Sequence, residues 1–168
     1  MKGSKVMEII TRSMEVRDLD GIMKIELESF TTPWSKESFK LEITDNKLAK
    51  YIIAEIDGKV VGYGGIWLIL DEGHITNIAV GKDYRGLGVG NYIVEALILY
   101  CKLMEIRNMT LEVRESNIVA QNLYKKYGFL DCGIRPNYYS DDNEDAVIMW
   151  KVIEEGEELV NISNRNIL

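Results

Sequence analysis

The sequence predicts a mixed α/β (α+β) fold in one domain, and three observations lead to this fold class. The chain has 168 residues, of which 46% are apolar and 28% charged, as in ordinary proteins with a hydrophobic core. Segments with alternating apolar residues, typical of strands, are interleaved with segments of helical spacing. One glycine-rich segment lies where an expected strand gives way to an expected helix. We expect a mixed central sheet of about seven strands with about four helices.

The N-terminal quarter predicts a strand and two helices. Residues 1–13 are interpreted as an extension, and the alternation over residues 14–17 predicts the first strand. Asp18 or Asp20 can cap a helix that follows, and Ser35, after a proline and a tryptophan, can cap a second one. The side chains expected to face inward from these helices include Ile22, Ile25, Leu27, Phe39 and Leu41.

Three antiparallel strands are expected next, over residues 51–56, 59–70 and 74–80. Asp57-Gly58 separates the first two and is a two-residue sequence favoured in hairpin turns. The apolar spacing then becomes helical from residue 88 to about residue 105.

The C-terminal third predicts a strand over residues 109–113 and a helix over residues 117–127, with Ser116 as its cap. The last two strands are expected at residues 129–134 and 146–153. The domain therefore spans residues 14–153, and residues 154–168 are interpreted as a loose, acidic and polar tail.

Composition limits where the protein works. No run of about 18 apolar residues occurs, so no transmembrane helix is expected, and no apolar segment of a secretory signal follows the first lysines. We therefore expect a cytoplasmic protein with no membrane association. Cys101 and Cys132 are far apart and fit reduced thiols. His74 is the single histidine, so a histidine-rich metal site is excluded, and we expect no metal.

The net charge of -7 is concentrated in one region. Residues 141–158 contain eight acidic side chains and one basic side chain, Lys151, whereas the rest of the chain is balanced. A general nucleic-acid binder needs a basic field, and none is visible. The acidic run suits an amine-bearing partner, although on charge alone a solvated loop and a charged tail explain it better.

The most informative segment runs from residue 80 to residue 91. Its alternating glycines let the backbone approach a ligand, and the helix that follows offers free amides and the positive end of its dipole. Together with Arg85 these features predict a pyrophosphate site. The P-loop pattern is absent, and Asn91 replaces the last glycine of the dinucleotide-binding fingerprint.

Arg85-Gly86-Leu87-Gly88-Val89-Gly90 resembles the pyrophosphate loop of the GNAT superfamily of N-acetyltransferases, and the order of expected elements agrees over nearly the whole domain. Five further segments are similar to the bacterial ribosomal-protein-alanine N-acetyltransferases. They are residues 33–35, 76–80, 111–117, 123–129 and 135–139. The resemblance implies the GNAT acyl-CoA N-acyltransferase fold and transfer of acetyl from acetyl-CoA to an amine.

The resemblance also implies the residues that hold acetyl-CoA. The backbone of Ile78, Ala79 and Val80 would lie beside the pantetheine arm, and a strand bulge there would turn the Val80 amide toward the thioester oxygen. The pyrophosphate would lie on the loop just described, and the Asn117 side chain would contact the pantetheine amides. Without the resemblance, residues 78–80 fit a buried strand and Asn117 fits the start of a helix.

Glu112 and Tyr124 are the candidate catalytic residues. Alternation places Glu112 on the opposite face of its strand from three apolar residues, where the resemblance makes it the base that acts directly or through water. Tyr124 would protonate the leaving thiolate and contact the cofactor sulfur. By position alone, Glu112 fits a surface charge and Tyr124 a core side chain. His74 is a second-line base or a structural residue.

The reference pKa values favour one type of acceptor. A glutamate near 4.3 is a poor base for a lysine near 10.4, whereas an α-amine near 7.7–8.0 needs little help at neutral pH. We therefore expect an N-terminal amine, and the resemblance indicates an alanine of a ribosomal protein. Trp34, Tyr138 and Tyr139 would wall the acceptor slot. A lysine or small amine as acceptor, and a non-catalytic CoA-binding module, are the alternatives.

Overall fold

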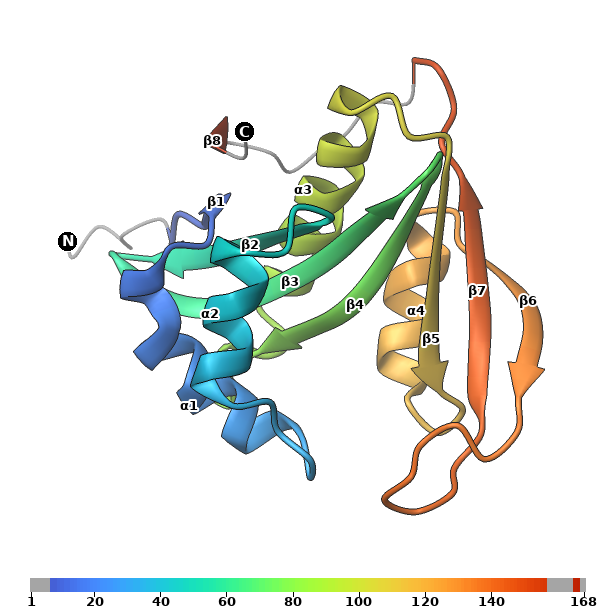
Figure 1. Cartoon of the computed structure of the whole chain (residues 1–168), viewed down its shortest axis with the longest axis horizontal. Coiled ribbons are helices and arrows are strands. Elements are labelled where there is room, and N and C mark those ends of the chain that lie inside the picture. The colour runs from blue at the N-terminus through green and yellow to red at the C-terminus, as the bar shows by residue number, and fades with distance from the viewer. Residues whose placement is uncertain (1–6, 157–164, 167–168) are drawn as a thin grey trace, which may run out of the picture.

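The computed structural model describes residues 7–156 and 165–166. The strands are β1 (Ile10–Ser13), β2 (Ala49–Ile56), β3 (Lys59–Ile69), β4 (Glu72–Val80), β5 (Asn108–Arg114), β6 (Leu130–Arg135), β7 (Ala146–Val152) and β8 (Arg165–Asn166). The α-helices are α1 (Leu19–Ser29), α2 (Lys36–Thr44), α3 (Val89–Leu103) and α4 (Ile118–Lys126), and short 3-10 helices cover Val16–Asp18 and Lys82–Tyr84 (Figure 1).

All eight described strands form one mixed sheet in the order β6-β7-β5-β4-β3-β2-β1-β8. The β4–β5 and β1–β8 pairs are parallel, and the other neighbours are antiparallel. The expected mixed sheet is therefore confirmed for its seven main strands. The two-residue β8 adds an edge pair from the segment predicted to be a loose tail, most of which lies outside the described residues.

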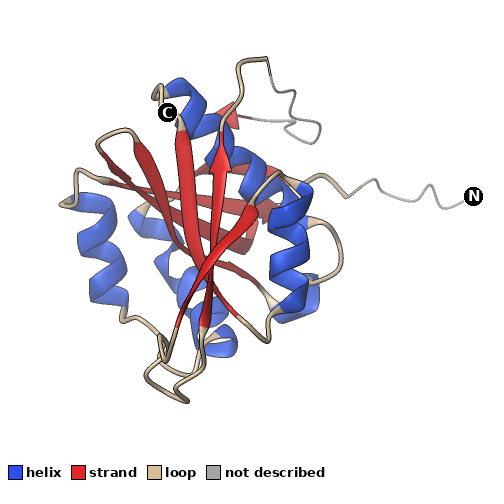
Figure 2. Ribbon diagram, turned by 90° about the vertical axis from the view of Figure 1, so that its right-hand side faces the viewer, coloured by secondary structure: helices blue, strands red, loops and turns tan. Residues whose placement is uncertain are grey.

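Helices cover both faces of the sheet (Figure 2). On one face α3 packs on β2 and β3, with residues such as Ile93 and Leu97 in a core shared with Ile52. On the other face α1 and α2 form a second core, in which Phe39 packs against Tyr63. The sheet is thus buried from both sides over its centre, and no described helix is long and apolar enough to cross a membrane.

The first strand was predicted four residues too late. Residues 10–13 pair with β2, whereas the predicted strand region turns into a 3-10 helix in which Glu15 and Asp18 form a capping box. The inward side chains near β1 are Ile9 and Thr11, and because Thr11 is polar the alternation is hidden in the sequence. Part of the predicted extension 1–13 therefore belongs to the sheet.

Two predicted core positions on the helices were wrong. Leu27 is 64% exposed and Leu41 is 50% exposed, whereas Glu26, next to Leu27, is buried. Ile22, Ile25 and Phe39 are buried as expected. α1 therefore turns the Glu26 carboxylate, and not the Leu27 side chain, toward the sheet.

Candidate active site

A cleft opens where β4 and β5 separate. These parallel strands pair only from Glu72 to His74 on β4 and from Asn108 to Thr110 on β5, and beyond that point they diverge (Figure 1). A cavity of about 460 Å³ lies between them, lined by β4, β5, α4 and the loops after α1 and β6. Because each strand keeps its other neighbour, the divergence leaves two backbone edges facing one another across the cleft.

The divergence begins at a bulge in β4. Gly65 of β3 pairs with Asn77 and Ile66 pairs with Ile75, so Thr76 is an extra residue on β4. A bulge bends its strand and increases the local twist, which turns the end of β4 away from β5. The bulge was expected near Val80 and lies four residues earlier, so that expectation was wrong, and Thr76 and Asn77 are the residues that it turns into the cleft wall.

Glu112 lies in the cleft wall on β5. Its side chain is 23% exposed, and its Oε1 atom is 3.1 Å from Nε of Arg135 on β6. The neighbouring Leu111 and Val113 are buried, as the alternation predicted. The carboxylate is therefore held in place by an ion pair and still borders the cavity.

Tyr124 borders the same cavity from α4. Its ring is buried and lies 5.9 Å from the ring of Phe129. Burial raises the pKa of the Tyr124 hydroxyl far above its usual value, and the nearby Tyr139 adds to the shift. Tyr124 is thus protonated at neutral pH, as a proton donor to a thiolate must be.

Asn117 also lines the cavity, but its side chain has a second task. It is the N-cap of α4, and its Oδ1 atom accepts the backbone N–H of Ala120 at 3.1 Å. Ser116, which was expected to be the cap, precedes it and donates its backbone N–H to Glu144. The side-chain oxygen of Asn117 thus binds the start of the helix, so its side-chain nitrogen, Nδ2, is the atom that can contact a ligand.

The glycine loop forms a tight turn between β4 and α3. Gly86 and Gly88 have φ values of +77° and +86°, a region that favours glycine, and α3 begins directly afterwards. No side chain would meet a Cβ atom at Gly86 within 4 Å, so the loop surface is open there. Loop amides and the start of a 15-residue helix meet there, which fits the binding of an anion.

Arg85 turns away from the loop. Its Nε atom donates to the Val80 carbonyl at 3.0 Å, and its guanidinium also donates to Oγ of Ser29 at 3.1 Å. This links the loop to the end of α1. Its guanidinium thus needs a rearrangement to reach an anion on the loop.

The aromatic residues predicted for the acceptor slot separate into two groups. Trp34 and Tyr139 line the cavity, whereas Tyr138 is outside it and packs edge-on against Tyr139 with ring centroids 5.1 Å apart. The Arg114 guanidinium stacks over Tyr139 at 4.0 Å, and burial raises the pKa of the Tyr139 hydroxyl to about 12.

Arg114 organises the acidic loop between β6 and β7. It forms ion pairs of 2.8–2.9 Å with Asp141, Asp142 and Glu144. Asp141 in turn accepts a hydrogen bond from Thr31 of the α1–α2 loop, which connects the two loops across the cavity mouth. The acidic loop is therefore folded against the cleft by one arginine and is not merely a solvated charge run.

The structure brings six of the predicted site residues to the cavity: Trp34, Ile78, Glu112, Asn117, Tyr124 and Tyr139. Ala79, Val80, Arg85, Gly86, Leu87, Gly88, Val89 and Gly90 lie on the adjoining strand end, loop and helix, and Tyr138 lies beside the slot. His74 pairs with Glu72 at 3.0 Å and does not line the cavity.

Sequence reasoning missed Glu26, Asn77 and Arg114, which also line the cavity. Glu26 does carry a signal, since it lies four residues after the buried Ile22 and helical spacing places it on the same face, unlike the exposed Glu28. Arg114 also carries a signal, since it lies two residues after Glu112, on the same face at the end of a strand. Among the described residues, no three His, Cys, Asp or Glu side chains are arranged to hold a metal ion.

Comparisons with known proteins show the family of this chain. The model of the acetyltransferase (GNAT) family matches residues 19–129. A putative [ribosomal protein bS18]-alanine N-acetyltransferase of Bacillus subtilis is 46% identical over 144 residues, covering 86% of this chain and 95% of that protein. The [ribosomal protein bS18]-alanine N-acetyltransferase of Escherichia coli K12 is 36% identical, covering 82% and 93%.

The fold is shared with solved structures. The crystal structure of the ribosomal-protein-S18-alanine N-acetyltransferase from Escherichia coli superimposes with a TM-score of 0.79 at 32% identity, covering 91% of this chain and 99% of that one.

Proposed function

Because this chain belongs to the GNAT family of acetyltransferases, we propose that it transfers the acetyl group of acetyl-CoA to the N-terminal amine of a protein, an alanine of a ribosomal protein. One observation carries the proposal for the site. A carboxylate, Glu112, and a protonated phenol, Tyr124, border one cleft from two different elements, and Trp34 and Tyr139 line the same cavity.

The residues fit acetyl-CoA as the acetyl donor. The β4 backbone beyond the bulge has no strand partner on the side that faces β5, so its amides and carbonyls are available to the pantetheine arm. The glycine loop and the first turn of α3 offer amides to the pyrophosphate, and Lys126 lies beside that turn through its hydrogen bond to Asn91. Acetyl-CoA would supply an activated thioester there.

Glu112 is the proposed base. Its carboxylate takes a proton from the acceptor ammonium, directly or through a water, and the amine lone pair then attacks the thioester carbonyl. An α-amine has a reference pKa near 7.7–8.0, so a carboxylate needs to supply little driving force, whereas a lysine near 10.4 needs much more. The same site therefore favours N-terminal amines over lysine side chains.

Tyr124 is the proposed acid. When the C–S bond breaks, its hydroxyl gives a proton to the leaving thiolate. The nitrogen gives up its second proton as the amide forms, which restores the Tyr124 hydroxyl, and the proton held by Glu112 leaves to solvent. The raised pKa of Tyr124 keeps its hydroxyl protonated until the C–S bond breaks. We expect no covalent acyl-enzyme, since no cysteine is among the described residues that line the cavity, and its serine, Ser29, accepts a hydrogen bond from Arg85.

A turnover assay tests the proposal. Thiol release from acetyl-CoA is measured with a basic peptide that begins with alanine, the same peptide blocked at its N-terminus but carrying a free lysine, and a polyamine. We expect turnover with the first peptide alone. Turnover with the lysine peptide or the polyamine instead would overturn the acceptor assignment and leave acetyl transfer standing.

Variants test the roles of the two residues. General acid–base groups typically contribute about 10²–10⁴-fold in rate, so Glu112→Gln and Tyr124→Phe should each lower kcat by at least about 10²-fold. Glu115→Gln and Tyr100→Phe make the same chemical changes at residues that do not line the cleft, and these should keep wild-type rates. If Glu112→Gln and Tyr124→Phe turned over as fast as their controls, Glu112 and Tyr124 would have no role in the chemistry.

A further inference from the structure

A second carboxylate, Glu26, lies in the wall of the cleft. It projects from the last turns of α1, is only 2% exposed and borders the same cavity as Asn77 of β4 and Trp34 of the α1–α2 loop. Its neighbour Leu27 faces solvent instead. Burying a carboxylate while exposing an adjacent leucine costs free energy, because an ionised group needs compensating partners in a dry environment. A carboxylate that is buried at this cost is a candidate for a functional role.

Two neutral donors hold the Glu26 carboxylate. The backbone N–H of Trp34 donates to Oε1 at 2.9 Å, and the hydroxyl of Tyr63 donates to Oε2. Burial and the Glu26 carboxylate together raise the pKa of Tyr63 far above its usual value, so Tyr63 remains a donor at neutral pH. A carboxylate accepts about four hydrogen bonds, and these two donors satisfy only part of that capacity.

Glu26 differs from the other acids of the cleft in its ion pairing. Five carboxylates line the cavity, and four of them pair with arginines: Glu112 with Arg135, and Asp141, Asp142 and Glu144 with Arg114. In the part of the chain that the structure describes, no lysine, arginine or histidine pairs with Glu26. It is therefore the cleft carboxylate whose charge no basic side chain neutralises.

We propose that Glu26 binds the positively charged α-ammonium of the incoming protein N-terminus. The proposal rests on the proposed function and specifies how that site recognises its acceptor. The ammonium supplies the missing positive charge and up to three donors, and charge-assisted hydrogen bonds of this kind are the strong ones.

The role of Glu26 complements that of Glu112. The terminus binds as an ammonium at Glu26, and its proton then passes to Glu112. The neutral amine no longer has a charge that attracts it to the Glu26 carboxylate. After transfer the product is an amide without charge. Glu26 therefore favours binding of the acceptor over binding of the acetylated product, which helps product release.

Binding without turnover tests this assignment. A peptide beginning with alanine is compared with its desamino twin, in which a propionyl group replaces the alanyl residue, for binding to the enzyme saturated with CoA. The two differ only in the charged group. In the wild type we expect the amine peptide to bind about tenfold more tightly or more.

Glu26→Gln keeps the shape and the acceptor for the Trp34 amide but removes the charge, so the preference should disappear while the CoA affinity stays the same. Glu28→Gln is the matched control, since Glu28 lies on the same helix, accepts the Lys82 amide at 3.0 Å and does not line the cleft. It should keep the full preference. Glu26→Asp, which restores a charge, should recover part of it.

Each outcome decides something different. No preference in the wild type overturns the role of Glu26 even if no variant folds, and a preference that survives Glu26→Gln in a folded protein does the same. A wild type that acetylates the alanine peptide but binds both peptides equally removes only this inference. A wild type that neither binds nor acetylates the alanine peptide removes the N-terminal acceptor as well.

Discussion

Substitution of Gly65 by alanine should strain the bulge that opens the cleft. Gly65 lies on β3 between Tyr51 of β2 and Asn77 of β4, directly beside the extra residue Thr76. A Cβ atom there would lie 2.6 Å from Cζ of Tyr51 and 2.7 Å from Oγ1 of Thr76, both shorter than real Cβ contacts. Tyr51 is 2% exposed and enclosed by Phe39, so it cannot simply move aside.

The size of the effect follows from overpacking. Extra atoms forced into a packed core typically cost about 1–3 kcal/mol. For a chain of this length, each kcal/mol lowers Tm by about 2–4 °C, so Gly65→Ala should lower Tm by roughly 2–12 °C. Because the strain falls on Thr76, the edge of β4 in the cleft should shift as well, and the affinity for CoA should fall.

Thermal unfolding and CoA titration measure the two effects. Gly133→Ala on β6 is the matched control, because a Cβ atom there would meet only Cδ1 of Ile148 at 3.7 Å, an ordinary contact. The control should keep both Tm and CoA affinity. If Gly65→Ala unfolds within about 1 °C of the wild type, the bulge is not packed as described and the reasoning fails.

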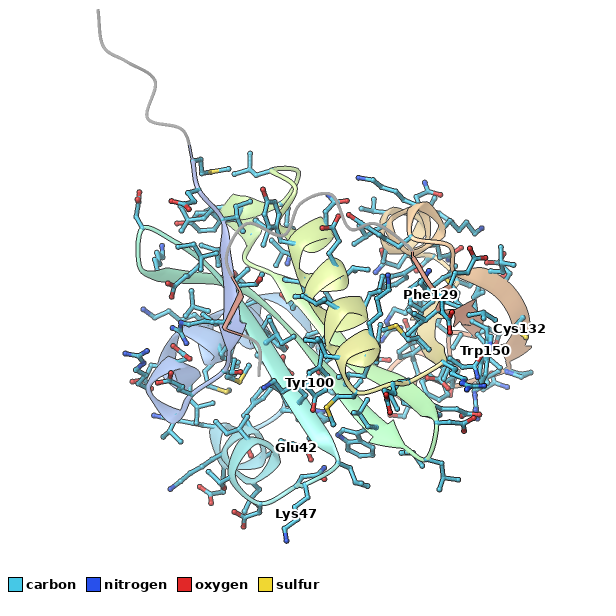
Figure 3. All side chains as sticks on the ribbon, turned by 90° about the horizontal axis from the view of Figure 1, so that it is seen from above. Glu42, Lys47, Tyr100, Phe129, Cys132 and Trp150 are labelled. Carbon is cyan, nitrogen blue, oxygen red and sulfur yellow. The ribbon has the colours of Figure 1, made fainter. Side chains whose placement is uncertain are left out.

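Three further predictions concern titration and reactivity. Arg114 lowers the pKa of Asp141, so this ion pair stabilises the protein above about pH 4 and ceases to do so as the pH falls through the lowered pKa. Arg114→Gln should therefore lower Tm at pH 7 and change Tm progressively less toward pH 2. An equal loss of Tm at both pH values would contradict this. Tyr124 has the opposite pH dependence because its pKa is raised: the stabilising contribution of its protonated hydroxyl is complete below about pH 10 and is lost above it. In a pH-jump experiment, Tyr124→Phe should therefore unfold less readily than the wild type between about pH 10 and 12. Burial raises the pKa of the Cys101 thiol to about 12, whereas Cys132 is exposed on the edge strand β6 (Figure 3). Iodoacetamide at pH 8 should therefore alkylate Cys132 alone in the native protein and both thiols in urea. Mass spectrometry would show which thiols are modified.

The sequence was informative where local patterns carry the structure. Asp57-Gly58 forms a turn with both residues at positive φ, Ser35 caps α2 by accepting the Ser38 amide, and Gly128 ends α4 at φ +86°. In each case one residue type suits one backbone conformation. The alternation of β5 likewise placed Glu112 correctly, because its buried neighbours are apolar.

The errors came from contacts between distant segments. The pairing of β1 with β2 depends on the polar Thr11 facing inward, and Arg12 ties this strand to Asp18 and Glu55 by ion pairs that no local pattern reveals. The position of the bulge at Thr76 depends on the register between β3 and β4. The hydrogen-bond donors to the Glu26 carboxylate come from another strand, at Tyr63, and from the next loop, at Trp34, so α1 alone does not reveal them.

The two walls of the cleft are held by different means, and this separates chemistry from access. A polar chain fixes the β4 wall from behind: Thr76 contacts the hydroxyl of Tyr51, which donates to Glu42 of α2, a half-buried carboxylate that also accepts a hydrogen bond from Trp67. The opposite wall is a continuous β5–β7 pair. At the mouth, by contrast, the loops meet through an exposed hydrogen bond between Thr31 and Asp141, and exposed contacts of that kind contribute little stability. An entering N-terminus can therefore displace the contact between the loops without moving the strands that carry Glu112 and the β4 edge, so changes in the loops should alter which acceptors enter while the acetyl-transfer groups keep their positions.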